Sequence, residues 1–221
     1  MSDVKVVIID YHMSNLYSVK NACERAGVAA ATTSDINKIM DADAVILPGV
    51  GAFSDAVDNL KKLDLISPIK DFVNSGRPFM GICLGMQLLF SESEEFGQTK
   101  GLALIPGRVV RFDAKKDVKV PHVGWSPINN PRSGPGKWGN SPLRGVQEDE
   151  YMYFIHSFYA VPENDKDVLS VTPYGGGDFC SSVLRENIFA AQFHPEKSAE
   201  EGVRIYSEWL RMVRDAEGEK S

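Results

Sequence analysis

The sequence predicts an α/β fold built on a doubly wound, mostly parallel sheet, with an added antiparallel portion. Val4–Asp10 is a run rich in β-branched residues, of the kind that is buried in a parallel sheet. Apolar residues then recur at helical spacing from Leu16 to Ala26, and Gly27 ends that helix. Because strands and helices continue to alternate, ligands are expected at the carboxyl ends of the parallel strands.

The other elements of the parallel sheet follow in chain order. Three further apolar runs are predicted as strands, at Val28–Thr32, Ala44–Leu47 and Pro78–Ile82. Helices are predicted across Asp35–Met40, Ser54–Lys62, Leu65–Ser75 and Met86–Phe90.

From about Gly101 onward, short alternating stretches predict the antiparallel portion. These stretches are Arg108–Phe112, Tyr151–Tyr159 and Val168–Val171. Between them, Asn129–Asn140 is rich in turn formers and is predicted as a surface loop, with Trp138 as a candidate partner contact.

A final helix is predicted after Ser198–Glu201, which has the pattern of a capping box. Its core face is expected to consist of Val203, Tyr206, Leu210 and Val213, with Trp209 beside them. The length suits one domain over residues 1–214, followed by a polar tail over residues 215–221.

Composition and charge exclude several classes of function. The chain has 221 residues, a net charge of −6 and no long basic run, which argues against binding to nucleic acid. No charged leader precedes an apolar run, and the stretch Pro78–Phe90 is too short to cross a bilayer, so a cytoplasmic protein without a membrane partner is expected. Cysteines 23, 83 and 180 have no close spacing, so neither disulfides nor a zinc site are expected.

Cys83 is the candidate nucleophile. It lies between Gly81 and Gly85, where an apolar strand is followed by a helix, and this is the layout of a nucleophile elbow. The glycines permit a sharp turn, and the helix N-terminus favours a thiolate. Alone the pattern is weak, because a buried cysteine is more often an inert small apolar residue.

His194 and Glu196 are the candidate partners of Cys83. Pro195 biases His194 toward extended geometry, in which residues two apart point to the same side. A lone histidine there can also cap a helix or bond a buried carbonyl. Together with Cys83, the two residues make a Cys-His-Glu triad, with its members at strand ends.

The glycine loop Pro48–Phe53 directly follows a predicted strand. Its amides and the Leu84 amide are placed to form an oxyanion hole at the same sheet edge. A simple strand-to-helix turn is the alternative. The loop lacks the spacing of a Walker or dinucleotide-binding motif, so phosphate binding is the poorer hypothesis.

These motifs together resemble the class I (triad) glutamine amidotransferases, through Pro48–Gly51, Gly81–Gln87 and Phe193–Ser198. Further blocks resemble, more narrowly, the glutaminase subunit of imidazole glycerol phosphate synthase: Asp10–Tyr11, Asn15–Leu16, Ser18–Val19, Pro121–Trp125 and Tyr153–Ser157. The resemblance implies a flavodoxin-like fold and hydrolysis of L-glutamine to glutamate and ammonia. It also implies a heterodimer with a (β/α)₈-barrel cyclase, which uses the ammonia on the route to histidine and purines. The residues themselves suggest no metal and no organic cofactor.

The resemblance also implies a role for each matching residue. The catalytic residues would be Cys83 as nucleophile, His194 as acid and base, and Glu196 as the group that orients it. The oxyanion hole would use the amides of Leu84 and of Val50 or Gly51. The substrate glutamine would be held by Gly51, Gln87 and the main chain at Ser157 and Phe158. The synthase interface would include Trp125, Tyr153 and Lys197.

Three positions depart from the family's pattern. His12 and Ser14 stand where the family usually has glycines, and Ser126 replaces an expected asparagine. Because the first of these turns lies near the partner in this family, one alternative is a paralogous glutaminase that feeds another synthase, such as one that forms an amidino group on a surface sugar. A cysteine hydrolase of another amide and a non-catalytic scaffold are further alternatives, although the intact triad argues against the scaffold.

The remaining histidines and cysteines are assigned no chemistry. His12, His122 and His156 show no spacing that suggests a shared metal site. Cys23 is expected on the core face of the first helix, and Cys180 has no evident base.

Overall fold

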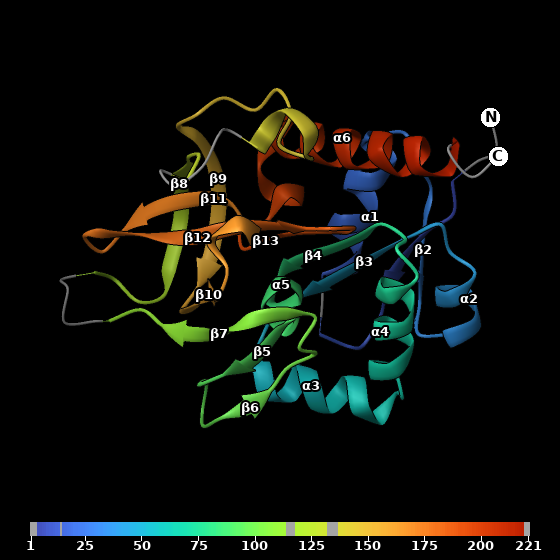
Figure 1. Ribbon diagram of the computed structural model, residues 1–221, viewed down its shortest axis with the longest axis horizontal. Coiled ribbons are helices and arrows are strands. Elements are labelled where there is room, and N and C mark those ends of the chain that lie inside the picture. Colours follow the sequence, from blue (N-terminus) through green and yellow to red (C-terminus); the bar gives the residue numbers. More distant parts are fainter. Residues whose placement is uncertain (1–3, 14, 114–117, 132–136, 219–221) are drawn as a thin grey trace.

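Within residues 4–13, 15–113, 118–131 and 137–218, which the computed structural model describes, a seven-stranded sheet forms the centre (Figure 1). In order along the sheet the strands are β11 (Val168–Tyr174), β12 (Gly177–Arg185), β13 (Ile188–Ala191), β4 (Phe79–Cys83), β3 (Ala44–Gly49), β1 (Val6–Ile9) and β2 (Ala30–Thr33). Neighbours from β13 to β2 are parallel, whereas β12 is antiparallel to both β13 and β11. The predicted doubly wound, mostly parallel sheet is therefore confirmed.

Helices cover both faces of this sheet. One face packs against α1 (Leu16–Arg25) and α6 (Ala199–Gly218), and the other against α2 (Ile36–Met40), α3 (Phe53–Lys62), α4 (Ile66–Asn74) and α5 (Leu84–Leu88). Val6 and Ile8 of β1 belong to the first core, and Val7 and Ile9 to the second. Because both faces are covered, β1 is apolar throughout. None of the helices in the described part of the chain is long and apolar enough to cross a membrane.

The predicted antiparallel portion is also present. The described residues form a sheet in the order β10 (Phe158–Pro162), β7 (Ile105–Arg111), β5 (Phe90–Ser93) and β6 (Thr99–Lys100), and a two-stranded hairpin of β8 (His122–Ile128) and β9 (Glu150–His156). Three 3₁₀-helices complete the description: η2 (Lys137–Asn140), η3 (Asp165–Asp167) and η4 (Pro195–Lys197).

The helix predicted at Met86–Phe90 was placed too late. α5 begins at Leu84, directly after Cys83, and Phe90 already pairs with Ile105 as the first residue of β5. A short apolar segment has no periodicity that separates a helix from a strand, so its boundary depends on the pairing with β7.

The loop predicted at Asn129–Asn140 was partly wrong. Residues 132–136 lie outside the described part, but the segment that follows them folds as η2, and Trp138 is only 6% exposed. The Trp138 indole Nε1 donates a hydrogen bond to the Leu169 carbonyl at 2.9 Å. Trp138 is therefore part of the core and not a partner contact.

The C-terminal boundary also differs from the prediction. Tyr206, Trp209, Leu210 and Val213 are buried as expected, whereas Val203, predicted on the same core face, is only half-buried. The helix α6 continues to Gly218 instead of ending before a tail at residue 215. Residues 219–221 lie outside the described part.

Candidate active site

The predicted site residues meet at the carboxyl edge of the parallel sheet. Gly49 at the end of β3 pairs with Cys83 at the end of β4, and Ala191 at the end of β13 pairs with Ile82. The loop after β3, the elbow after β4 and the segment after β13 therefore leave the sheet side by side. This is the edge at which a doubly wound sheet places its ligands.

Cys83 has the backbone geometry of a nucleophile elbow. Its φ and ψ are 55° and −110°, in a region that residues other than glycine rarely occupy. Gly85 explains how the turn closes, because a Cβ atom there would lie 1.8 Å from the Leu47 carbonyl oxygen of β3. The strained turn is thus held by the close approach of α5 to the neighbouring strand.

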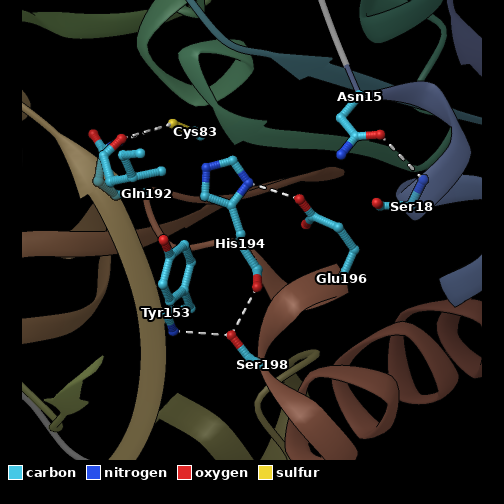
Figure 2. Close-up of polar contacts among 9 residues, drawn as sticks. Asn15, Ser18, Cys83, Tyr153, Gln192, His194, Glu196 and Ser198 are labelled. Carbon is cyan, nitrogen blue, oxygen red and sulfur yellow. Dashed lines mark hydrogen bonds and ion pairs between the residues drawn. The ribbon is translucent and has the colours of Figure 1, made fainter. Parts of the chain in front are cut away.

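His194 and Glu196 form a buried pair next to Cys83 (Figure 2). Nδ1 of His194 lies 2.6 Å from Oε1 of Glu196, and the two side chains are only 3% and 2% exposed. Tyr153 and Ser198 hold the backbone: His194 N donates to the Tyr153 carbonyl, and the Ser198 hydroxyl donates to the His194 carbonyl and accepts from Tyr153 N. The Ser198 hydroxyl therefore fixes the backbone at His194, whereas the sequence predicted that it would cap the final helix.

The charge balance of this pair favours a protonated imidazole. Burial lowers the pKa of His194, but the Cys83 sulfur and the Glu196 carboxylate outweigh this effect and raise it to about 10. His194 Nε2 has no hydrogen bond of normal geometry within the described residues, yet it lies close enough to Cys83 for the sulfur charge to act on it. The arrangement therefore favours an imidazolium at position 194 at neutral pH.

A cavity of about 320 Å³ opens at Cys83. All the residues predicted to bind substrate or to form the oxyanion hole line this cavity, together with several that were not predicted. The complete lining consists of Val50, Gly51, Cys83, Leu84, Gln87, Glu95, Pro121, Ile155, His156, Ser157, Phe158 and Lys197. Its volume lies within the lower part of the range of small-molecule sites.

Sequence reasoning missed Gln192, which links the nucleophile to the cavity wall. Its Nε2 lies 3.6 Å from the Cys83 sulfur, and its Oε1 accepts a hydrogen bond from Gln87 Nε2 at 3.0 Å. Gln87 Nε2 also donates to the Phe158 carbonyl at 2.9 Å. No local pattern marked Gln192, because the chain bends at residues 192 and 193 and the side chain reaches Cys83 only through the pairing of β13 with β4.

The oxyanion hole expected from Val50 is not assembled. The Val50 amide donates a hydrogen bond of 2.7 Å to the Met13 carbonyl and so is not free to bind an oxyanion. Gly51 has a φ of 109°, and a Cβ atom there would lie 2.8 Å from Met13 Cε. The turn after β1 therefore holds the glycine loop after β3.

That turn contains one of the replaced glycines. His12 adopts a φ of 67°, a left-handed conformation that glycine takes without strain, and its amide donates to the Asp10 side chain at 3.0 Å. The substitution thus keeps a conformation suited to the family's glycine, while Ser14 lies outside the described residues.

His122 and His156, to which no chemistry was assigned from the sequence, contact each other in the structure. They form a cross-strand pair of the β8–β9 hairpin, with His122 Nδ1 3.2 Å from His156 Nε2. His156 Nδ1 lies 2.8 Å from the Phe158 carbonyl, and His122 Nε2 lies 2.8 Å from the hydroxyl of Ser126. Ser126, at the position of the expected asparagine, therefore ends a buried polar chain that starts at the cavity wall.

The three residues expected at the synthase interface cluster at the cavity mouth. The rings of Trp125 and Tyr153 meet edge to face at 6.0 Å, and Lys197 Nζ lies 5.7 Å from the Tyr153 ring centroid. Trp125 is 51% exposed, whereas Lys197 also lines the cavity.

Glu95 is a second residue that sequence reasoning missed. Its carboxylate lines the cavity, and Oε2 accepts a hydrogen bond from the Phe53 amide at the start of α3. No local pattern marks Glu95, because it reaches the site only through the packing of the β5–β6 turn against α3. As for metals, no cluster of three or more candidate ligands occurs among the described residues.

Residues 7–211 match the family described as glutamine amidotransferase class-I. The chain is 48% identical over 205 residues to imidazole glycerol phosphate synthase subunit HisH of Syntrophotalea carbinolica, covering 90% of this chain and 96% of that relative. It is 45% identical over 200 residues to the subunit of the same name in Rhodopirellula baltica, covering 90% and 94%.

Solved structures show the same fold. PurLQS of Thermotoga maritima superposes with a TM-score of 0.71 at 19% identity, covering 96% of this chain and 99% of that chain. A structure described as a glutamine amidotransferase gives a TM-score of 0.71 at 17% identity, covering 94% and 98%. At these identities the likeness concerns the fold alone.

Proposed function

This chain belongs to the class I glutamine amidotransferases and, within them, to the family of imidazole glycerol phosphate synthase subunit HisH, and we propose that its cavity hydrolyses L-glutamine through Cys83, His194 and Glu196. The observation that carries the proposal is the burial of His194 between Cys83 and the Glu196 carboxylate, at the wall of a cavity lined by Gln87 and Phe158.

The proposed reaction begins at the Cys83 sulfur. The thiolate attacks the side-chain carbonyl carbon of glutamine, and the carbonyl oxygen becomes an oxyanion held by backbone amides. His194 then gives its proton to the nitrogen, the carbon–nitrogen bond breaks, and ammonia leaves. Water activated by the now neutral His194 hydrolyses the remaining thioester to glutamate and frees Cys83.

The conformation of the glycine loop after β3, which contains Val50, can control the activity. The Val50 peptide must release the Met13 carbonyl before its amide can turn toward the oxyanion. One preorganised oxyanion donor is typically worth about 10²–10³-fold in turnover. We therefore expect the chain alone to hydrolyse glutamine slowly, although its triad is in place.

We propose that the partner is a (β/α)₈-barrel cyclase and that it docks on the outer face of the β8–β9 hairpin. Alternate residues of the hairpin point outward, and this face is apolar: Val123, Trp125, Tyr151 and Ile155 are each more than 40% exposed. Exposed apolar patches of this kind mark interaction surfaces. Free ammonia becomes ammonium in water, so a partner over the cavity mouth also protects the product.

The test is a glutaminase assay with and without the purified cyclase and its nucleotide substrate. We expect the liganded cyclase to raise turnover by about 10²-fold or more, since an oxyanion donor becomes available. A Trp125→Ala variant should need more cyclase for half-maximal activation while its basal rate stays unchanged. Activation by a different synthase, and not by this cyclase, would favour the paralogous glutaminase instead.

Replacing Glu95 with glutamine is expected to raise the KM for glutamine about 10-fold or more, with kcat little changed. Glu95 contributes a carboxylate to the cavity, and the substrate carries a cationic α-amino group, so the loss of a charge-assisted contact weakens ground-state and transition-state binding alike. The amide oxygen of the variant can still accept from Phe53 N. Glu92→Gln, on the preceding strand β5 and outside the cavity, is the matched control, and equal KM values in the two variants would contradict the assignment.

The family membership favours the histidine-pathway assignment over the paralogue, and the assembled triad argues against a scaffold. A cytoplasmic location is also proposed, because Cys23, Cys83 and Cys180 are all free thiols, which a reducing compartment preserves.

A further inference from the structure

We propose that Gln192 is a further catalytic residue, whose side-chain amide donates a hydrogen bond to the Cys83 sulfur and stabilises the thiolate. Gln192 Nε2 lies 3.6 Å from Sγ, and the residue is completely buried. The inference rests on the proposed role of Cys83 as nucleophile, so its test measures the reactivity of the thiol and not glutamine turnover.

The fold places Gln192 beside the nucleophile by strand register. Ala191 at the end of β13 pairs with Ile82 of β4, so the next residues, Gln192 and Cys83, leave the sheet as neighbours. The backbone N–H of Gln192 donates a hydrogen bond to the Ser181 carbonyl of β12 at 2.9 Å. The backbone at Gln192 is therefore fixed to β12.

Hydrogen bonding determines which end of the Gln192 amide faces the sulfur. The Phe158 carbonyl can only accept, so the nearest side-chain atom of Gln87 must be its NH₂ group. The second proton of that group points to Gln192, which must present its oxygen in return. The NH₂ group of Gln192 is left facing Cys83.

The Phe158 carbonyl is itself held by the buried histidine chain. Burial lowers the pKa of His156 to about 3 and that of His122 to about 4, so both rings are neutral at pH 7. A neutral His156 that donates Nδ1–H to Phe158 must accept at Nε2 from His122, which in turn accepts from Ser126. All the hydrogen bonds from Ser126 through the two histidines therefore point in one direction and end at the Phe158 carbonyl, which orients Gln87 and, through it, Gln192.

The donor matters most in the charged form of Cys83. The Ile155 carbonyl, which lies 4.0 Å from the sulfur, can accept from a thiol but repels a thiolate. A neutral amide donates at every pH, and hydrogen bonds to charged atoms are about twice as strong as those between neutral ones. Titratable groups around Cys83 and its cavity are His194, Tyr11, His156, Glu95 and Lys197.

The test is the rate of alkylation of Cys83 by iodoacetamide as a function of pH, in the full chain. Gln192→Met keeps the volume of the side chain but removes the donor, and we expect its half-maximal rate at a pH about one to two units higher than in the wild type. Cys83→Ala gives the background from the two other cysteines. Gln98→Met, an exposed glutamine bonded to Glu92, is the matched control and should titrate like the wild type.

A purely structural Gln192 gives the opposite result. A folded Gln192→Met variant with a lower melting temperature and the wild-type alkylation profile would overturn the proposal. A second measurement needs no variant at the site: the side-chain amide protons of Gln192, followed by NMR, should shift across the alkylation midpoint in the wild type and not in Cys83→Ala. Protons that do not respond to pH in the wild type would overturn the proposal equally.

Discussion

Replacing Cys83 with alanine is expected to lower glutamine hydrolysis by about 10⁴-fold or more, because no other group can form the thioester. The measurement is glutamate release by the chain in the presence of the liganded cyclase. The complex should still use added ammonia, because the fold and the partner surface remain. Loss of both activities would point to misfolding, and retained hydrolysis would exclude Cys83 as the nucleophile.

Cys23→Ala is the matched control for this variant. Cys23 is also a free, buried cysteine, but it lies on the core-facing side of α1 and does not line the cavity. Its burial raises the pKa of the thiol to about 12, which keeps it protonated and unreactive. We expect this variant to lose some stability and to keep its glutaminase activity.

Replacing Glu196 with glutamine is expected to lower kcat by about 10³–10⁴-fold with little change in fold. The carboxylate accepts Nδ1–H of His194 at 2.6 Å and supports the imidazolium, and an amide at this place favours the wrong tautomer. Glu196 also helps to raise the pKa of His194 to about 10, so its removal lowers that pKa. The alkaline limb of the pH–rate profile should therefore move to lower pH.

The profile of kcat against pH, measured with the liganded cyclase, tests both parts of this prediction. Glu200→Gln is the matched control, because Glu200 lies four residues further along, is exposed, and pairs with Arg25 on the surface. An unchanged alkaline limb in Glu196→Gln would show that the carboxylate does not act on His194.

The triad was accessible from sequence because each of its parts has a local signature. Glycines on both sides of Cys83 are required by the elbow, and Pro195 keeps His194 extended. The glycine loop after β3 was recognised for the same reason. The conformation of this loop, in which the Val50 amide is occupied, was not predicted, because the hydrogen bond from Val50 to Met13 joins the turn after β1 to the loop after β3. The extended segment predicted to carry both His194 and Glu196 was wrong beyond His194, because Pro195–Lys197 fold as the 3₁₀-helix η4, which places Glu196 beside the histidine.

Gln192, Glu95 and the histidine pair show the limit of local patterns. None has a spacing that marks it as functional. Each becomes part of the site through a contact between distant segments, such as the pairing of β8 with β9, which brings His122 to His156.

Periodicity and turn chemistry were thus enough for the order of strands and helices along the chain and for the apolar character of the central strands. They also placed Cys83, His194 and Glu196 at one sheet edge, because these features depend on neighbouring residues and on the rule that parallel strands end at one edge. Trp138 in the core, the extent of α6, the occupied Val50 amide and the donor to the Cys83 sulfur depended on packing and hydrogen bonds between remote parts of the chain. Buried polar groups must find partners wherever the fold supplies them, and the sequence alone does not show which partner that is.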